Sequence, residues 1–69
     1  MHYLMSFVRN GRAVTFPFIY DEDMFDFAIS LPEEEWRNAT YYLILGAETL
    51  KDMTDDWVEC IEDELERRR

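Results

Sequence analysis

The first twenty residues alternate apolar with polar or mixed side chains on either side of Asn10-Gly11. Asn-Gly is preferred in two-residue type I′ turns, because both central residues of that turn need positive φ. The pattern predicts an antiparallel β-hairpin over residues 2–20, with its second strand at a sheet edge because Pro17 has no N–H to donate. An isolated hairpin is barely stable in water, so the rest of the chain has to cover its apolar face. The pairs expected on that face are Tyr3 with Phe18, Met5 with Phe16, Phe7 with Val14 and Arg9 with Arg12.

The segment after the hairpin has the spacing of a helix. Its apolar residues recur at i, i+3, i+4 and i+7, which places them on one helix face. Three acidic residues come just before them, where negative charge favours a helix N-terminus. We therefore expect a short helix over residues 22–29. The apolar residues are Met24, Phe27, Ala28 and Leu31, and the acids are Asp21, Glu22 and Asp23.

Residues 32–45 are compatible with either a helix or a strand. Ser30 and Glu33 match the S-x-x-E capping box, which favours a helix that starts near residue 32. A seam of apolar residues and threonines at steps of four and three, from Trp36 to Ile61, also favours a helix. The run Tyr41–Leu45 beside a glycine favours a strand. We favour the helix and keep the strand as the alternative.

The pattern predicts an amphipathic, acidic helix over residues 47–67. Most positions outside its apolar stripe are acidic, and arginines at 67–69 place positive charge at its C-terminal end. The whole chain, residues 1–69, is thus expected to form a single α+β domain, in which the N-terminal hairpin packs against two or three helices. The stripe consists of Leu50, Met53, Trp57, Val58, Ile61 and Leu65.

The charge of the chain restricts its partners. Sixteen acidic residues face seven basic ones, for a formal net charge of -9, and residues 21–66 hold all the acids with only two bases. Proteins bind nucleic acid and anionic membranes through basic groups, so neither is expected as a direct partner. Because 48% of the residues are hydrophobic, the chain should nevertheless fold.

The sequence also favours a cytoplasmic location. Residues after Met1 lack the cationic start and apolar stretch of a signal peptide, so none is expected. The longest apolar run, Tyr41–Leu45, is far shorter than a membrane-spanning helix. Cys60 has no second cysteine to pair with, which fits a reducing compartment.

We expect neither enzymatic activity nor a cofactor or metal. His2 is the only histidine, and Cys60 lies among acids and not beside the basic groups that activate a thiol. Ser6 and Ser30 have no neighbouring histidine to activate them. The acids at 21–23 lack the alternation and the glycine of a calcium loop, and no Glu-x-x-His pair of a di-iron bundle is present.

The candidate site is a partner-binding surface on the acidic helix. Its acids recur at helical spacing, which places them in rows about 5–6 Å apart, an interval comparable with that of DNA phosphates. Tryptophan and tyrosine dominate binding hot spots, so the surplus aromatic residues are candidate anchors. The competing interpretation is that the acids only keep the protein in solution. The candidates are Asp52, Asp55, Asp56, Glu59, Glu62, Asp63 and Glu66, with Trp36, Tyr41, Tyr42 and Trp57.

In size, in its acidic segment Asp52–Glu66 and in its lack of catalytic groups, the chain resembles the small acidic inhibitors that bacteriophages and mobile elements make against host machinery, including anti-restriction and anti-CRISPR proteins. These proteins share no single fold, so no functional residues are transferred from them. The resemblance implies a stoichiometric blocker of a basic, nucleic-acid-handling host protein, without a cofactor, in the host cytoplasm. The alternative is a structural or regulatory homodimer, antitoxin-like or an adaptor, joined through the seam from Trp36 to Ile61.

Overall fold

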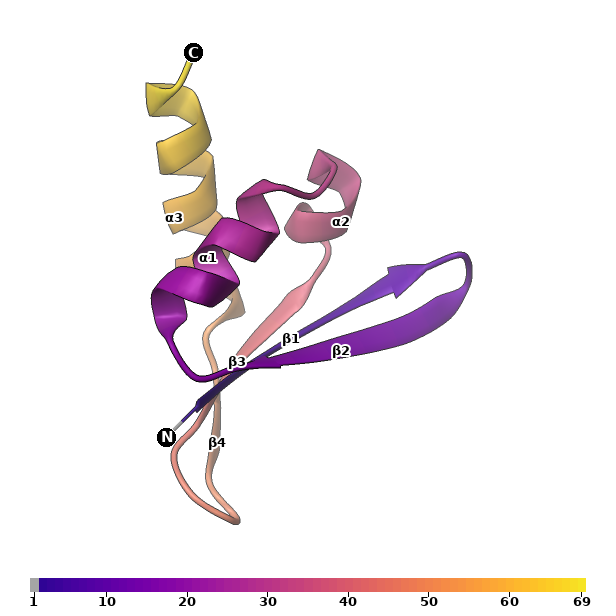
Figure 1. Ribbon diagram of the computed structural model, residues 1–69, viewed down its shortest axis with the longest axis vertical. Helices are drawn as coiled ribbons and strands as arrows, with labels where there is room; N and C mark the ends of the chain where they lie inside the picture. Colours follow the sequence, from indigo (N-terminus) through magenta and orange to yellow (C-terminus); the bar gives the residue numbers. More distant parts are fainter. Residues whose placement is uncertain (1) are drawn as a thin grey trace.

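The computed structural model describes residues 2–69 and has an α+β architecture, as the sequence predicts. Four antiparallel strands form one sheet in the order β2-β1-β3-β4. In Figure 1 the three helices lie above strands β1 to β3. The strands are β1 (His2–Arg9), β2 (Arg12–Phe18), β3 (Thr40–Ile44) and β4 (Leu50–Asp52), and the helices are α1 (Asp21–Ile29), α2 (Glu33–Arg37) and α3 (Thr54–Arg67).

The predicted hairpin is confirmed, including its register. Asn10 and Gly11 have φ of 53° and 76°, as a type I′ turn requires. Strand β2 is the outermost strand on its side of the sheet, so Pro17 lies at an edge, where its missing N–H costs no ladder bond. All four expected pairs are present: Tyr3–Phe18, Met5–Phe16, Phe7–Val14 and Arg9–Arg12.

The turn gives a first testable prediction. A Cβ at Gly11 would meet no atom within 4 Å, so the effect of Gly11→Ala comes from its positive φ alone. We expect this variant to lose about 1–2 kcal/mol of unfolding free energy, measured by urea denaturation. Gly46 has equally open space and no positive φ, so Gly46→Ala is the matched control and should be neutral or stabilising by up to about 1 kcal/mol. Equal destabilisation by both substitutions would contradict the assignment of the turn.

Helix α1 confirms the expected helix, but the capping box that was to start the next helix does not form. Ser30 belongs to the end of α1, where its hydroxyl donates a 2.6 Å hydrogen bond to the carbonyl of Phe27. Helix α2 starts after Pro32 without a side-chain cap. The Glu33 carboxylate reaches Arg37 instead of Ser30.

The helix favoured over residues 32–45 is wrong, and the strand alternative is correct. Helix α2 ends at Arg37, and strand β3 begins at Thr40. The second edge of β1 is open to pairing, and β3 fills it with the pair Leu4–Tyr42 at its centre and Met5–Tyr41 next to it. Backbone pairing with a distant strand thus overrides the local helical spacing. That spacing depends only on residues close in sequence and carries no information about pairing with β1.

The helix expected over residues 47–67 begins seven residues later, at Thr54. Leu50 lies instead in β4, and its side chain is 55% exposed. Asp52 sets the start of the helix, because its carboxylate accepts hydrogen bonds from the backbone N–H of Thr54 at 2.9 Å and from its hydroxyl at 2.6 Å, as in an Asx turn. The seam from Trp36 to Ile61 is therefore divided among α2, β3, β4 and α3 and is not one helix surface.

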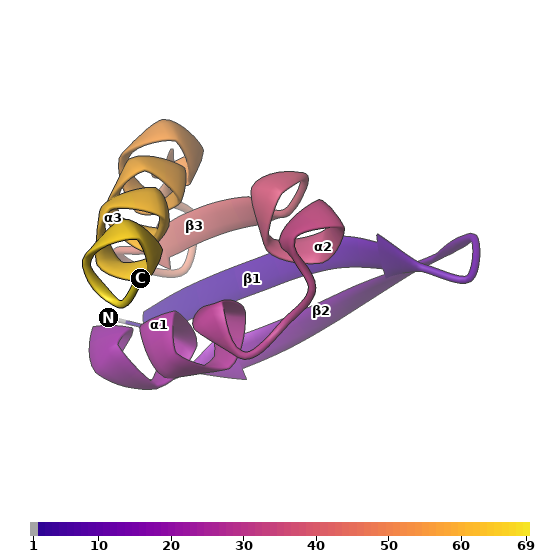
Figure 2. The ribbon, with the colours of Figure 1, turned by 90° about the horizontal axis from the view of Figure 1, so that it is seen from above.

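The core lies between the helices and one face of the sheet. Figure 2 shows α1 and α3 at one end of the sheet and α2 further along β1. Two aromatic groups meet there. Phe27 contacts Phe16 and Phe18, and Trp57 contacts Tyr3, Phe25 and Tyr41. The buried residues of the core are Met5, Phe7, Met24, Ala28, Trp36, Ala39, Tyr41 and Ile61.

Candidate functional site

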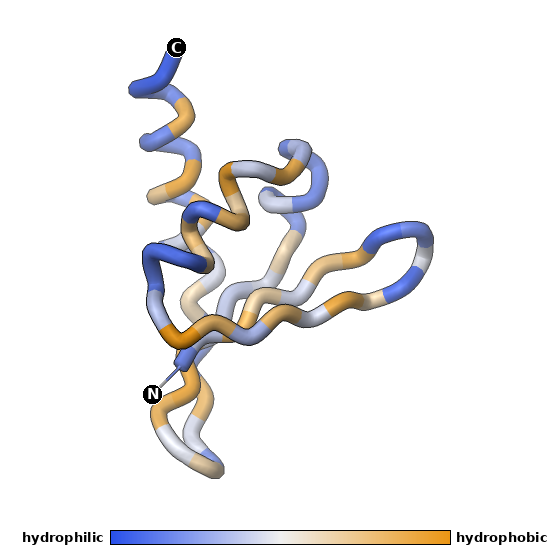
Figure 3. The backbone as a smooth tube through the Cα atoms, viewed as in Figure 1, coloured by the Kyte–Doolittle hydropathy of each residue, from blue (hydrophilic) through white to orange (hydrophobic). Residues whose placement is uncertain are grey.

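Most acidic residues of α3 face solvent, and its apolar residues face the core. Hydrophilic and hydrophobic stretches alternate along this helix in Figure 3. Ile61 is fully buried, and Trp57, Val58 and Leu65 pack against the core. The predicted stripe is thus confirmed within α3. Its outward, exposed acids are Asp55, Asp56, Glu59, Glu62, Asp63 and Glu66.

Most of these outward acids have no basic neighbour. Glu62 forms an ion pair with Arg37 at 3.2 Å. The partly buried Glu64 binds both Arg67 and Arg68. Within residues 2–69, no basic group lies within 4 Å of the other five outward carboxylates, so their negative charge is not neutralised locally. We call these five residues the α3 acidic face: Asp55, Asp56, Glu59, Asp63 and Glu66.

The seventh acidic candidate, Asp52, has a structural role. Its hydrogen bonds to Thr54 lower the pKa of the carboxyl group. The Thr54 hydroxyl in turn accepts the backbone N–H of Tyr41 at 3.1 Å, and the Tyr41 carbonyl accepts the N–H of Met53 at 2.8 Å. Asp52 therefore fixes the N-terminus of α3 to strand β3 and holds the acidic face in one orientation.

This contact has a pH dependence of known sign. A carboxyl group whose pKa is lower in the folded than in the unfolded state stabilises the fold above its unfolded pKa, and this contribution is lost as the pH falls through the folded value. Asp52→Asn keeps an oxygen that can accept the Thr54 hydrogen bonds but does not titrate. We expect the variant to lose less unfolding free energy than the wild type between about pH 5 and pH 2. Asp63→Asn, at an exposed position without such bonds, is the control and should follow the wild type; an unchanged pH profile of Asp52→Asn would contradict the role of Asp52.

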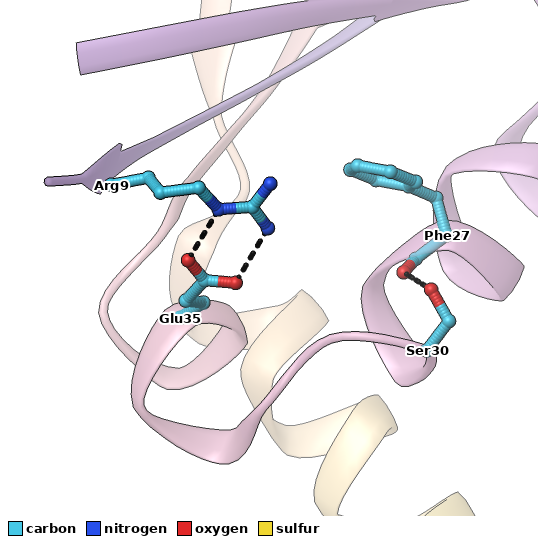
Figure 4. A network of polar contacts seen from close by, with 4 residues as sticks. All are labelled: Arg9, Phe27, Ser30 and Glu35. Atoms are coloured by element: carbon cyan, nitrogen blue, oxygen red, sulfur yellow. Dashed lines mark hydrogen bonds and ion pairs between the residues drawn. The ribbon is translucent and has the colours of Figure 1, made fainter. Parts of the chain in front are cut away.

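One of the few bases is bound away from the acidic face. Arg9 donates two hydrogen bonds of 2.8 Å to the Glu35 carboxylate and also lies 5.2 Å from the centroid of the Phe7 ring. Figure 4 shows this pair, together with the Ser30 hydroxyl on the Phe27 carbonyl. The hydrogen bond from Arg9 lowers the pKa of Glu35. The pair joins the tip of the hairpin to α2 and takes one guanidinium out of reach of α3.

Two of the four aromatic candidates are not on the surface. Trp36 is 2% exposed and Tyr41 is fully buried, so the expectation that they anchor a partner is wrong. The Tyr41 hydroxyl donates a 2.6 Å hydrogen bond to the carbonyl of Trp36, and burial raises the pKa of Tyr41. Tyr42 pairs with Leu4 and lies on the sheet face opposite to that of Tyr41. Trp57 alone among the four lies both partly exposed and beside the acids of α3.

Trp57 forms part of a groove between α1 and α3. The groove has a volume of about 490 Å³ and is lined by four apolar residues and three acidic ones. The rings of Phe25 and Trp57 have centroids 6.1 Å apart and are tilted by 47°. We call this feature the α1–α3 groove. Its apolar lining residues are called its floor and its acidic ones its rim: the floor is Phe25, Met53, Trp57 and Cys60, and the rim is Asp21, Glu22 and Asp56.

Sequence reasoning found only half of this groove. The sequence predicts Asp56 and Trp57 as partner-binding residues, whereas it assigns Asp21 and Glu22 to the start of a helix and excludes them as a calcium loop. The signal that could have found the other half is Phe25, an aromatic residue next to but outside the apolar stripe of α1. A helix that presents a phenylalanine beside its core stripe and acids in its first turn combines apolar and negative groups on one side.

The residues considered for chemistry do not come together. Cys60 is a free, exposed thiol on the floor of the groove, and His2 lies exposed at the start of β1. Across residues 2–69, no three His, Cys, Asp or Glu side chains are grouped so that they could hold a metal ion. None of the helices described is both long and apolar enough to cross a membrane.

Comparison with known proteins gives no match to a protein-family model, to a curated protein or to a solved structure.

Proposed function

We propose that this chain is a non-catalytic binding protein that inhibits a larger, basic, nucleic-acid-handling protein by covering its positively charged surface. The observation that carries the proposal is the α3 acidic face: five exposed carboxylates on one helix, none of them with a basic group within 4 Å in the described chain. Such an array steers a cationic partner and supplies the complementary charge for the complex.

The proposal is supported by the way in which α3 is held. The helix is anchored by buried Ile61, by Trp57 stacked on Tyr41 at 6.0 Å, and by the Asp52–Thr54 hydrogen bonds at its start. Its carboxylates are therefore presented in a fixed arrangement before any partner binds. A preorganised surface loses less conformational entropy on binding than a flexible acidic tail.

Close carboxylates also repel one another, which lowers the stability of the free protein. An acidic surface that only served solubility would gain from interspersed bases, as is usual on protein surfaces. Here the bases near α3 contact Glu62 and Glu64 and leave the other outward acids unpaired. This favours a binding role over solubility alone.

The proposed setting follows from the resemblance to phage and mobile-element inhibitors. Such a protein works in the cytoplasm of the host cell, by stoichiometric occlusion and without a cofactor. The lone Cys60 is consistent with a reducing compartment. The dimeric adaptor is the less favoured proposal, because the seam from Trp36 to Ile61 on which it depended is divided among four elements.

A capture experiment with two variants of equal net charge tests the proposal. The tagged chain is incubated with bacterial extract at low and high salt, and bound proteins are identified by mass spectrometry. We expect the wild type to retain at low salt a basic protein that added DNA displaces. The face variant should lose it and the control variant should keep it. The face variant is Asp55→Asn, Glu59→Gln, Asp63→Asn and Glu66→Gln, and the control variant is Asp23→Asn, Asp26→Asn, Glu34→Gln and Glu48→Gln.

The control variant neutralises exposed acids outside α3, so the two variants differ only in where charge is removed. Retention of the same protein by the face variant would contradict the proposal. So would a captured partner that DNA does not displace.

A further inference from the structure

We propose that the α1–α3 groove is an arginine-binding site, which receives one arginine side chain of the basic partner. The inference rests on the proposed function and names the contact that anchors the partner beside the acidic face. An arginine side chain combines an aliphatic stem with a planar cation, and the groove combines an apolar floor with an acidic rim.

The groove carries its charge on two separate elements. Asp21 and Glu22 come from the first turn of α1, and Asp56 comes from the first turn of α3. In residues 2–69, no basic side chain lies within 4 Å of any of the three. A cation in the groove would thus have carboxylates of both helices near it, and hydrogen bonds between a guanidinium and a carboxylate are among the strong ones in proteins.

The floor offers aromatic surface to such a cation. Trp57 and Phe25 are both partly exposed, and their rings lie at an angle to each other. Guanidinium groups stack on aromatic faces, and tryptophan gives the strongest cation–π interaction. Met53 and Cys60 complete an apolar surface against which the methylene stem can pack.

Two of the chain's own arginines are bound by the same combination of an aromatic ring and carboxylates. Arg9 lies 5.2 Å from the Phe7 ring centroid and binds the Glu35 carboxylate. Arg37 lies 4.7 Å from the Trp36 ring centroid and forms ion pairs with Glu33 and Glu62.

In both places an aromatic ring and carboxylates hold one guanidinium. The α1–α3 groove has the same two components, with a tryptophan and three acids, but none of the chain's own arginines among its lining residues. Other ligands fit less well. The acidic rim disfavours anions and purely apolar molecules, because both would leave the carboxylates unpaired and partly desolvated. An arginine satisfies the rim and the floor together.

The test uses two peptides that differ in one charge: acetyl-Gly-Gly-Arg-Gly-Gly-amide and its citrulline counterpart, which keeps the shape of the side chain but is neutral. Binding is followed by ¹H–¹⁵N NMR. We expect the arginine peptide to shift the Trp57 indole resonance and the amides of Phe25 and Cys60, with about tenfold higher affinity than the citrulline peptide.

A groove variant and its control complete the design. The groove variant should reduce affinity for the arginine peptide to that for the citrulline peptide, whereas the groove control should stay within about twofold of the wild type. Circular dichroism checks that both are folded. The groove variant is Asp21→Asn, Glu22→Gln and Asp56→Asn, and the groove control is Asp23→Asn, Glu34→Gln and Glu48→Gln.

Equal binding of the two peptides, equal effects of the two variants, or shifts spread along α3 away from the groove would overturn the inference. The face variant described above retains Asp21, Glu22 and Asp56. If the face variant loses its macromolecular partners and the peptide test fails, the arginine site is contradicted and the proposed function is not. If the groove binds the arginine peptide but the chain captures no charge-dependent partner, the proposed function is contradicted and the arginine site is not.

Discussion

Replacing Trp36 with alanine is expected to lower the free energy of unfolding by about 3–5 kcal/mol, the largest effect of any single substitution proposed for this chain. Trp36 is 2% exposed, and its indole ring fills the space between α2, the sheet and the remaining core residues. Its removal leaves a cavity and also ends the contact with the Arg37 guanidinium, 4.7 Å from the ring centroid. Small domains have total stabilities near the lower end of about 5–15 kcal/mol, so the variant should be largely unfolded well below the melting temperature of the wild type.

The matched control is Leu50→Ala. Both residues belong to the seam from Trp36 to Ile61 that the sequence predicts, and if that seam were the buried contact surface the two substitutions would have similar costs. In the structure Leu50 is 55% exposed on β4, so its truncation should cost less than about 1 kcal/mol. Urea denaturation followed by far-UV circular dichroism measures both. Similar losses of unfolding free energy for the two variants would show that Trp36 and Leu50 are buried together along the predicted seam, and would contradict the placement of Leu50 on an exposed strand.

The contrast between these two residues shows what the sequence could and could not predict. The hairpin was predictable to the residue pair, because Asn10-Gly11 fixes the turn and a period of two fixes which side chains face the core. Helix α1 was predictable for a similar reason, since its stripe and its acidic first turn are both local. Neither prediction required knowledge of a distant contact.

Strand β3 could not be decided in this way. The local pattern of its residues favours a helix, and pairing with the free edge of β1, more than thirty residues earlier in the chain, makes them a strand. The start of α3 depends in the same manner on how Asp52 and Thr54 meet Tyr41 of β3. Because β3 and β4 are strands, the helix expected over residues 47–67 starts seven residues later, and the residues of the seam no longer lie on one surface.

The site was half predictable for the same physical reason. Helical spacing gave the outward acids of α3 correctly, because α3 is a helix at each of those positions. It could not say which aromatic residues are exposed, since that depends on tertiary packing: Trp36 and Tyr41 are buried, whereas Trp57 lies at the edge of the core. Nor could it bring the first turns of α1 and α3 together into a groove.

The second large effect concerns the acidic face. At about 50 mM salt we expect the face variant to bind nona-arginine, a defined cationic ligand, about 100-fold more weakly than the wild type. Four close charges at roughly 1 kcal/mol each in water would give a larger loss of affinity than this, and screening by salt reduces their summed contribution. The salt dependence of the remaining affinity should be shallower, because fewer ion pairs release fewer counterions. Isothermal titration calorimetry at several salt concentrations measures both quantities.

The control variant of equal net charge decides what this loss means. If the total charge of the molecule governed binding, the control and face variants would weaken it equally, and the α3 acidic face would be no more than part of a general negative field. We expect the control to retain affinity within about threefold of the wild type, because its neutralised acids are distributed over α1, α2 and the loop before β4. Carboxylates act together on a cationic ligand only where they lie within about a Debye length of one another on a common face, and α3 places its outward acids one helical turn apart on such a face.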